Sequence, residues 1–322
     1  MTSDVTVPRR LMLLDSASLY FRAFYGVPDT RRFPAEPPSN AVRGFLDMVA
    51  TLVTVHRPTH LVACWDNDWR PAFRVAAIPT YKTHRLTQGS DVEEESPENL
   101  TPQVPVIRDV LRAFGIVRAG ADGYEADDVI GTLATRAVAA GFSAVDIVTG
   151  DRDLFQLVDD AARVRVLYTA RGGVRSPDLI TQAYLQGKYA VPTGAAYADM
   201  AVLRGDASDG LPGVPGIGEK TAAAMIERYG DLAGLRRAVA DGDDRLRGAH
   251  RTRLTAAASY LDVAPTVVRV ALDAPVEIGD LDDAALPIEV ADLTLLSRVA
   301  SEVGVTSSIN RVLAALGFED DS

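Results

Sequence analysis

The chain has 322 residues, 47% of them hydrophobic and 24% charged, a composition that excludes a disordered or fibrous chain. It has no apolar run of the roughly 18 residues that a membrane-spanning helix needs, and its N-terminus lacks the apolar segment of a secretory signal. Its one cysteine, Cys64, cannot form an internal disulfide, so we expect a cytoplasmic protein. The 33 basic and 44 acidic residues give a net charge of −11, which argues against a nucleic-acid binder whose whole surface is positive.

The first half of the chain alternates strand patterns with helix patterns. Short apolar runs predict strands at 10–14, 60–65 and 144–148. Apolar residues at helical spacing predict helices at 42–55, 104–114 and 126–139. This alternation indicates an α/β fold with a mostly parallel sheet flanked by helices on both faces.

The second half of the chain is mainly helical in pattern, which predicts a helical second domain after about residue 181. Helices are expected at 195–203, 219–229, 231–239, 252–261, 291–302 and 307–316, and one strand at 266–272. Back in the first half, the acidic run 91–98 lies among Pro, Ser and Thr residues, so we interpret it as a solvated loop.

Acidic residues follow each of the three predicted strands: Asp15, Asp66 and the pair Asp151 and Asp153. A single aspartate at a strand end is usually a turn residue or a helix cap. Three strands that all end in carboxylates indicate a shared site, because ligands bind beyond the carboxyl ends of the strands in such sheets.

Two further acidic clusters lie at 125–128 and 206–209. If a helix begins at Glu125, that residue and Asp128 share one of its faces, with Asp127 about 100° away. The alternative is that this cluster only starts a helix, because acidic residues in a first turn suit the helix dipole.

Carboxylates gathered in one place need cations, since their mutual repulsion otherwise raises their pKa values. Oxygen ligands alone favour hard divalent ions such as Mg²⁺ or Mn²⁺, and the four histidines lack the spacing of a zinc site. Two such ions close together can clamp the attacking and leaving oxygens of a phosphodiester. Phosphoryl chemistry is therefore the favoured class.

A glycine-rich turn, LPGVPGIGEK, ends at Lys220 and precedes the helix pattern 219–229. Free backbone N–H groups before a helix N-terminus suit a phosphate oxygen, and the lysine adds a positive charge. This turn resembles a helix-hairpin-helix, a sequence-independent binder of the nucleic-acid backbone. The alternative is a plain glycine cap between two helices.

The segment TYKTHR places Lys82 three residues before Arg85. On a helix both would face one phosphate, and Tyr81 beside them could stack on a base. The alternative is a solvated basic face. Only three of the 33 basic residues are lysines, and two of them, Lys82 and Lys220, lie in the segments that we assign to nucleic acid.

The strings LDSASLYFRAF, WDNDWRPAFR, YKTHR, GYEADDVIGTLA, TGDRDLFQLV and GDASDGLPGVPGIGEKTA resemble, in order and spacing, the motifs of the bacterial 5′ nuclease (flap endonuclease) family. That family includes the N-terminal domain of many bacterial DNA polymerases I. The resemblance extends to about Leu316 and implies a stand-alone 5′ nuclease. It implies a PIN-like catalytic domain at 1–182 with a helical arch near 70–105, a helix-three-turn-helix DNA-binding domain at 183–262, and a strand and helices at 263–322 that pack back on the catalytic domain.

The resemblance also implies roles for individual residues. The first metal cluster would be Asp15, Asp66, Glu125, Asp127 and Asp128. The second would be Asp151, Asp153, Asp206 and Asp209. Asp128 and Asp151 would be essential for cleavage, and Lys82 and Arg85 would hold the scissile phosphate. Further DNA contacts are expected at Tyr20, Phe21, Arg74, Tyr81, Gly213, Gly216, Gly218, Lys220 and Thr221, and relatives hold a monovalent cation such as K⁺ at the hairpin.

Two departures from the family pattern stand out. Asp68 and Trp69 occupy positions where relatives usually carry small and basic residues, which makes Asp68 a spurious ligand candidate and Trp69 a candidate for stacking on substrate. Gly210 follows Asp209 where asparagine is common, which we expect to loosen the turn.

The expected function is a divalent-metal-dependent 5′-3′ exonuclease and 5′-flap endonuclease of DNA replication and repair. We expect a monomer without membrane association that acts on DNA with a 5′ flap, nick or 5′ end, in one pathway with DNA polymerase I and ligase. Two alternatives remain. A catalytically silent DNA-junction binder would have substitutions among the acidic positions, and a PIN-type ribonuclease would seldom carry the helical hairpin.

Overall fold

A six-stranded sheet with the order β3-β2-β1-β4-β5-β6 organises the first part of the chain in the computed structural model, which describes residues 8–33, 35–91 and 93–318. The strands are β1 Arg10–Asp15, β2 His60–Cys64, β3 Val117–Ala119, β4 Ala144–Thr149, β5 Val164–Tyr168 and β6 Asp178–Ile180. Every neighbouring pair is parallel except β5 and β6. The predicted α/β fold with a mostly parallel sheet is confirmed, although the short strands β3, β5 and β6 were not predicted.

The two faces of the sheet bury alternate residues of β1 in two separate cores. Met12 and Leu14 pack with the helices α2 (Asn40–His56) and α4 (Gln103–Phe114). Leu11 and Leu13 pack on the other face with α5 (Ala126–Ala139). Because strand side chains alternate between faces, an apolar run such as RLMLL is what a strand covered on both sides requires.

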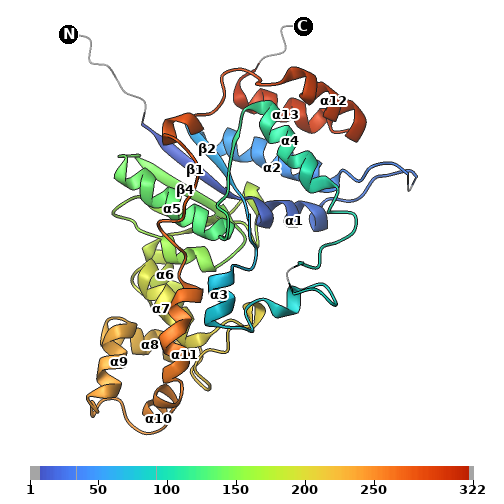
Figure 1. Cartoon of the computed structure of the whole chain (residues 1–322). Helices are drawn as coiled ribbons and strands as arrows, with labels where there is room; N and C mark the ends of the chain where they lie inside the picture. The colour runs from blue at the N-terminus through green and yellow to red at the C-terminus, as the bar shows by residue number, and fades with distance from the viewer. Residues whose placement is uncertain (1–7, 34, 92, 319–322) are drawn as a thin grey trace, which may run out of the picture.

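The second part of the chain is helical and lies below the sheet in Figure 1. Its helices are α6 Gln182–Tyr189, α7 Gly194–Arg204, α8 Glu219–Tyr229, α9 Leu232–Ala240, α10 Ala249–Ala256 and α11 Ala258–Val268. The helix predicted at 252–261 is two helices, because the backbone of Ala257 leaves the helical region between them. None of the helices among the described residues is long and apolar enough to cross a membrane.

The strand predicted at 266–272 is wrong. Val267 and Val268 form the last turn of α11 and are buried there. A run of β-branched residues at helical spacing can therefore pack as a helix face, and packing overrides the strand preference.

The last helices, α12 (Leu293–Val303) and α13 (Thr306–Leu316), return to the top of the sheet part beside α2 and α4 (Figure 1). Side chains of both helices join the core that contains α2 and α4. An ion pair between Arg311 and Asp47 at 2.8 Å links α13 to α2 at the surface.

Candidate active site

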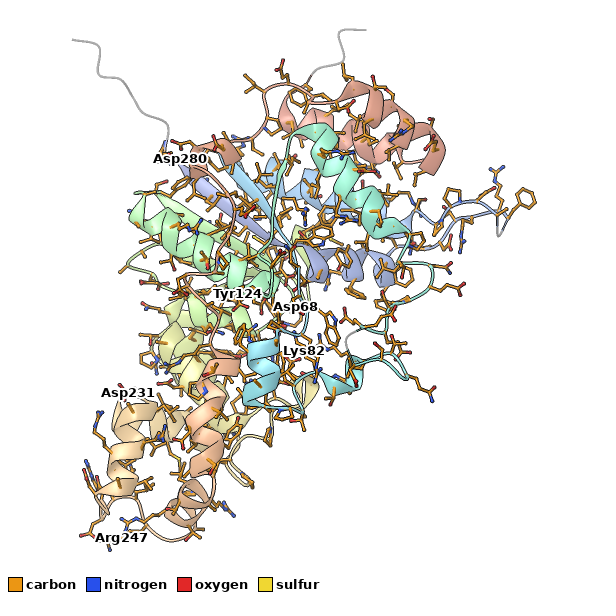
Figure 2. All side chains as sticks on the ribbon, in the orientation of Figure 1. Asp68, Lys82, Tyr124, Asp231, Arg247 and Asp280 are labelled. Carbon is orange, nitrogen blue, oxygen red and sulfur yellow. The ribbon has the colours of Figure 1, made fainter. Side chains whose placement is uncertain are left out.

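A pocket of about 480 Å³ lies at the carboxyl ends of β1, β2 and β4, where the predicted strands were expected to bring their acidic residues. Seven carboxylates line it: Asp15, Asp66, Glu94, Glu125, Asp127, Asp151 and Asp206. Lys82 and Arg85 line the same pocket. Figure 2 places Lys82 and Asp68 where the sheet part meets the helical part, far from Arg247 at the tip of the helical part.

Asp15 lies where β1 passes into α1 (Ser16–Gly26) and caps that helix by accepting a hydrogen bond of 3.1 Å from Ser18 N. Its other oxygen accepts a bond of 2.6 Å from the Thr149 hydroxyl at the end of β4. Burial raises the pKa of Asp15 to about 7, and the negative charges of Asp66 and Asp151 add to the rise. The negative charges of Asp15, Asp66 and Asp151 therefore repel one another in the pocket.

Asp66 and Asp127 also line the pocket and add to this repulsion. Asp66 Oδ1 accepts a hydrogen bond of 2.8 Å from Ala126 N, which joins the end of β2 to the first turn of α5. Burial raises the pKa of Asp66. Burial also raises the pKa of Asp127 well above its usual value, helped by the charges of Asp151 and Asp15. Such a site favours bound cations.

Glu125 differs from these carboxylates because two positive groups, Arg74 and Lys82, already contact it. Oε1 accepts hydrogen bonds from Arg74 Nη1 at 2.9 Å and from the Tyr81 hydroxyl at 2.7 Å, and Oε2 forms an ion pair with Lys82 Nζ. Burial alone would raise its pKa, but the charges of Lys82 and Arg74 outweigh burial and lower it. Glu125 is therefore ionised and paired with cations of the chain itself.

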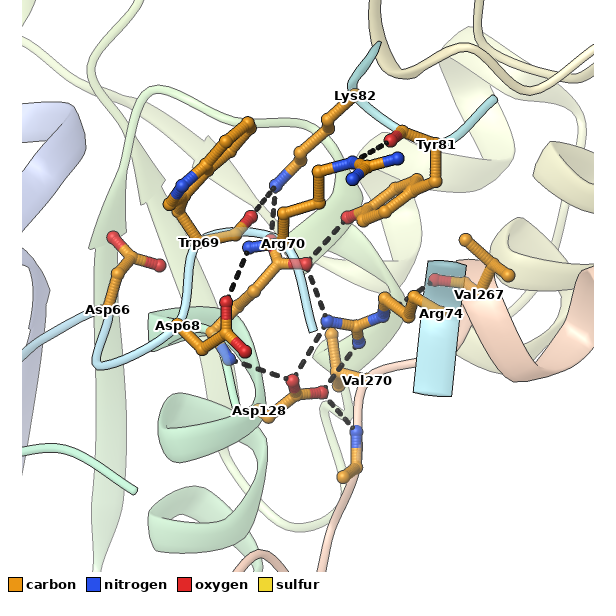
Figure 3. A network of polar contacts seen from close by, with 12 residues as sticks. Asp66, Asp68, Trp69, Arg70, Arg74, Tyr81, Lys82, Asp128, Val267 and Val270 are labelled. Atoms are coloured by element: carbon orange, nitrogen blue, oxygen red, sulfur yellow. Dashed lines mark hydrogen bonds and ion pairs between the residues drawn. The ribbon is translucent and has the colours of Figure 1, made fainter. Parts of the chain in front are cut away.

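Asp128 does not lie where the sequence predicted. It is fully buried outside the pocket lining, and its oxygens accept bonds from Arg74 Nη2 at 2.7 Å, Arg74 Nη1 at 2.9 Å and Ala271 N at 2.7 Å (Figure 3). It also accepts a bond of 3.2 Å from Glu125 N, at the start of α5. The helix-start alternative therefore describes Asp128 better than the expected role as a metal ligand and catalytic residue.

Arg74 and Tyr81 were expected to contact DNA, and the structure places both in the interior, 2% and 4% exposed. Arg74 lies on the short helix α3 (Ala72–Ala77) and donates to Val267 O at 3.1 Å as well as to the carboxylates. Tyr81 packs in the core below the sheet. The resemblance implied a DNA contact for Arg74 and the aromatic ring suggested stacking for Tyr81, but partners distant in sequence bury both side chains.

Lys82 and Arg85 reach the pocket, but not from a shared α-helix. Lys82 has a left-handed backbone with φ of 50° and precedes a single 3₁₀ turn, Thr83–Arg85. Its ammonium group contacts Glu125 and lies 3.4 Å from Trp69 O. Arg85 pairs with Asp209 at 2.7 Å. In the described parts of the predicted arch, 70–91 and 93–105, regular helix is limited to α3, this turn and the first residues of α4.

The second acidic group divides in the structure. Asp151 and Asp206 line the pocket, whereas Asp153 and Asp209 lie outside its lining. Burial raises the pKa of Asp153 well above its usual value, and the charges of Asp151 and Asp209 contribute, so the group shares one electrostatic environment. Asp206 is held by Ser208, whose backbone N–H donates at 2.9 Å.

Glu94 lines the pocket although the sequence indicated only a solvated loop around it. Its segment folds back on the residues after Lys82, with Glu95 N donating to Arg85 O at 2.7 Å and Thr87 N donating to Glu93 O at 2.8 Å. Neither hydrophobic periodicity nor motif spacing predicts that this loop folds back, because the fold-back depends on hydrogen bonds between two loop segments.

Tyr20 and Phe21, which are expected to contact DNA, line the pocket, and Trp69 lines it as well. The Tyr20 ring lies 5.7 Å from the ring of Trp65, between their centroids. Asp68, in contrast, is absent from the lining, and its Oδ1 accepts a bond of 3.1 Å from Arg70 N. Asp68 is thus a turn residue in this arrangement.

The predicted hairpin lies between α7 and α8. Gly213 and Gly216 have positive φ values of 64° and 78°, and Gly218 caps α8. At Gly213 a Cβ atom would lie 2.4 Å from Arg204 O, so this close turn requires glycine. Lys220 is exposed in the first turn of α8, and Thr221 follows it.

The donor set of the pocket fits hard divalent cations in its chemistry, because it consists of carboxylates whose charges raise one another's pKa values. Within residues 8–33, 35–91 and 93–318, no three histidine, cysteine or acidic side chains are yet gathered tightly enough to hold an ion. The position of Glu125 explains part of this, since Lys82 and Arg74 occupy both of its oxygens.

Two family models and several known proteins match this chain. The chain matches the models of the 5′-3′ exonuclease N-terminal resolvase-like domain over residues 10–190 and the 5′-3′ exonuclease C-terminal SAM fold over residues 192–291. A 5′-3′ exonuclease of Streptomyces coelicolor is 56% identical over 310 residues, which cover 95% of this chain and 99% of that protein. A 5′-3′ exonuclease of Mycobacterium tuberculosis is 48% identical over 314 residues, 95% of this chain and 97% of that one.

Among solved structures, the flap endonuclease of bacteriophage T5, in complex with DNA and metal ions, has the same fold with a TM-score of 0.64. It is 17% identical, and the likeness covers 96% of this chain and all of that one. At this identity the likeness shows the fold alone. The two matching domain models and the two relatives of nearly equal length show that the chain belongs to the 5′-3′ exonuclease family.

Proposed function

We propose that the chain is a structure-specific 5′ nuclease that hydrolyses DNA phosphodiesters with divalent metal ions, as a 5′-3′ exonuclease and 5′-flap endonuclease. The observation that carries the proposal is one pocket lined by seven carboxylates together with Lys82 and Arg85. Carboxylates that repel each other suit metal ions, and the adjacent cations suit a phosphate. The names of the relatives, 5′-3′ exonucleases, and the flap endonuclease of bacteriophage T5 with DNA and metal ions support the same reaction.

Two groups of residues would hold the ions, which we propose to be Mg²⁺ or Mn²⁺ because the donors are oxygens. The first is Asp15, Asp66, Glu125 and Asp127, and the second is Asp151, Asp153, Asp206 and Asp209. Bound there, two ions would stabilise the attacking and leaving oxygens of the phosphodiester. Asp128 is left out because it is fully buried outside the pocket lining, with both of its oxygens bonded to Arg74.

Lys82 and Arg85 would hold the scissile phosphate and stabilise its developing negative charge. To do so Lys82 has to leave Glu125 and Arg85 has to leave Asp209. The phosphate would then replace one carboxylate partner of each cation. Tyr20, Phe21 and Trp69 at the rim would pack against a base or sugar.

The hairpin with Gly213, Gly216, Gly218, Lys220 and Thr221 would bind the duplex backbone outside the pocket. We propose K⁺ as its cation and a cytoplasmic monomer as the working form. The substrates are DNA with a 5′ flap, a nick or a 5′ end, such as a DNA polymerase I leaves and a ligase later seals.

The test compares matched 5′-flap, nicked and blunt duplexes in Mg²⁺, in Mn²⁺ and in chelator. Asp127→Asn and Asp151→Asn should abolish product while DNA binding stays within a few-fold, whereas Glu302→Gln, an exposed change on α12, should cleave normally. Normal turnover by both aspartate variants would refute the proposal. Binding without metal-dependent product would show a silent junction binder, and preferred cleavage of a matched RNA flap would show a ribonuclease.

A further inference from the structure

A second groove, of about 600 Å³, runs between α4 and the edge strand β3. Three arginines and one carboxylate line it: Arg108, Arg112, Arg118 and Asp109. All three arginines are exposed. No motif or family resemblance in the sequence pointed to this surface.

The exposed face of α4 supplies two of these cations. Arg108 and Arg112 lie four residues apart on the helix and therefore on one side of it. The opposite side, with Ile107, Val110 and Leu111, is buried in the core against the sheet. Burial of the apolar face fixes the helix and turns the arginines toward the groove.

The positive charge of the groove is only partly neutralised. Asp109 pairs with Arg112 at 3.0 Å. Across the parts of the chain that the structure describes, neither Arg108 nor Arg118 forms an ion pair with a carboxylate. Partial burial and the charge of Arg108 lower the pKa of Arg118, which shows that the two guanidinium groups repel each other. An anion between them would relieve this repulsion.

The groove adjoins the carboxylate pocket along β3. The Arg118 guanidinium lies 5.6 Å from the centroid of the Trp65 ring, and Trp65 directly precedes Asp66. Two residues beyond Arg118, Gly120 packs so closely against Asn67 that a Cβ atom there would lie 2.3 Å from Asn67 Oδ1. Asn67 lines the pocket, so one strand segment connects the groove to the pocket rim.

Two residues of a strand span about 6.6 Å, and a DNA strand in a duplex carries a phosphate about every 3.4 Å along its axis. A DNA strand with one phosphate in the pocket would therefore place a further phosphate near Arg118, from which the groove continues to Arg108. We propose that the groove between α4 and β3 binds backbone phosphates of the DNA strand that enters the pocket. This inference rests on the proposed nuclease function and extends its substrate contacts beyond the pocket and hairpin.

The test is the salt dependence of binding. The dissociation constant of a labelled 5′-flap duplex is measured in chelator at several KCl concentrations for the wild type and for Arg108→Ala/Arg118→Ala. Loss of two phosphate contacts should reduce the slope of log affinity against log salt by about 1.4 to 1.8.

Arg57→Ala is the matched control, because Arg57 is exposed and precedes β2, at the amino end of the parallel strands, whereas the pocket lies at their carboxyl ends. It should leave the slope unchanged. If the double variant fails to fold, Arg108→Gln alone should reduce the slope by about 0.7 to 0.9. The two alanine variants are compared by thermal unfolding before binding is measured.

An unchanged slope in the folded groove variants would overturn the inference. The inference would also be overturned if the variants lost binding of inorganic phosphate or of an acidic peptide while the salt dependence of their DNA binding stayed at the wild-type value. If the wild type itself makes no metal-dependent product, the proposed nuclease function fails instead. If the wild type cleaves DNA but the variants keep the wild-type salt dependence of binding, only the proposed role of the groove is refuted.

Discussion

The guanidinium of Arg74 binds both carboxylate oxygens of Asp128, at 2.7 and 2.9 Å, and neither residue is more than 2% exposed to solvent. The pair joins α3, on the segment that carries Lys82, to the first turn of α5. Asp128 also holds the backbone of Ala271, so three distant stretches of chain meet at one carboxylate. Its position is that of a structural group.

Asp128→Asn should therefore lower stability and spare metal binding. Breaking this buried ion pair leaves the positive charge of Arg74 buried without the negative charge of Asp128. We therefore expect the free energy of unfolding to fall by about 3 kcal/mol. Urea unfolding in chelator measures this loss, and Mn²⁺ titration of the folded protein should give the wild-type affinity. Asp127→Asn is the contrasting variant, because it relieves repulsion in the pocket: stability should hold while Mn²⁺ affinity falls. Equal losses of Mn²⁺ affinity in the two variants, with Asp128→Asn as stable as the wild type, would contradict this assignment.

Removing Lys82 should strengthen metal binding although it weakens cleavage. The ammonium group of Lys82 forms an ion pair with the Glu125 carboxylate. It has to be displaced before a metal ion can bind that carboxylate oxygen. We expect Lys82→Ala to bind Mn²⁺ about tenfold more tightly without DNA, equivalent to about 1.4 kcal/mol. Calorimetric titration measures the change. Lys188→Ala, which removes an exposed lysine from α6, should bind Mn²⁺ as the wild type does, and a wild-type affinity in Lys82→Ala as well would show that no such competition exists.

Gly210→Ala should loosen the segment that carries Lys82. Gly210 has a φ of 73°, and a Cβ atom there would lie 2.2 Å from Thr80 O. The strained backbone and the clash should lower the free energy of unfolding by about 1 to 3 kcal/mol. They should also speed amide hydrogen exchange at residues 80–85. Gly187→Ala is the control, because a Cβ atom there meets open space, and it should leave that exchange unchanged. If the amides at residues 80–85 stayed protected in Gly210→Ala, the close packing of Gly210 against Thr80 would not hold this segment in place.

The metal-free protein should lose stability as pH rises. The pKa of Asp15 is about 7 in the folded state and close to 4 in the unfolded state. Between these values the folded chain binds a proton that the unfolded chain has lost, so stability falls with rising pH from about 4 to about 7. In chelator the melting temperature should therefore drop over this range, and Asp15→Asn should flatten the drop. A melting temperature that rises from pH 5 to pH 7 would contradict this assignment.

The carboxylate pocket could be predicted because the sequence pattern that indicates it is local. Each of three apolar runs ends in an aspartate, and parallel strands bring such ends together whatever the rest of the chain does. Asp15, Asp66 and Asp151 accordingly line one pocket. The α/β class followed from the same alternation of strands and helices.

The residues that sequence reasoning misplaced depend on distant partners. Arg74 looked like a surface cation, but its partners include a backbone carbonyl at Val267, 193 residues along the chain. Tyr81 looked like a stacking residue, but its hydroxyl donates to Glu125. Glu94 reaches the pocket because its loop folds back on Arg85. Local pattern contains none of these long-range contacts, so a motif position alone could not distinguish a substrate contact from a structural one.

The meeting of Arg74, Asp128 and the backbone at 267–271 limits where the chain can be divided. The two family models abut near residue 191, yet Val267 and Ala271 belong to the second of them. A fragment ending at that boundary would lose Asp206 from the acidic pocket and two of the backbone groups that complete the buried Arg74–Asp128 pair. We therefore expect a gene fusion or truncation that ends before Ala271 to be less stable than a chain that retains these groups.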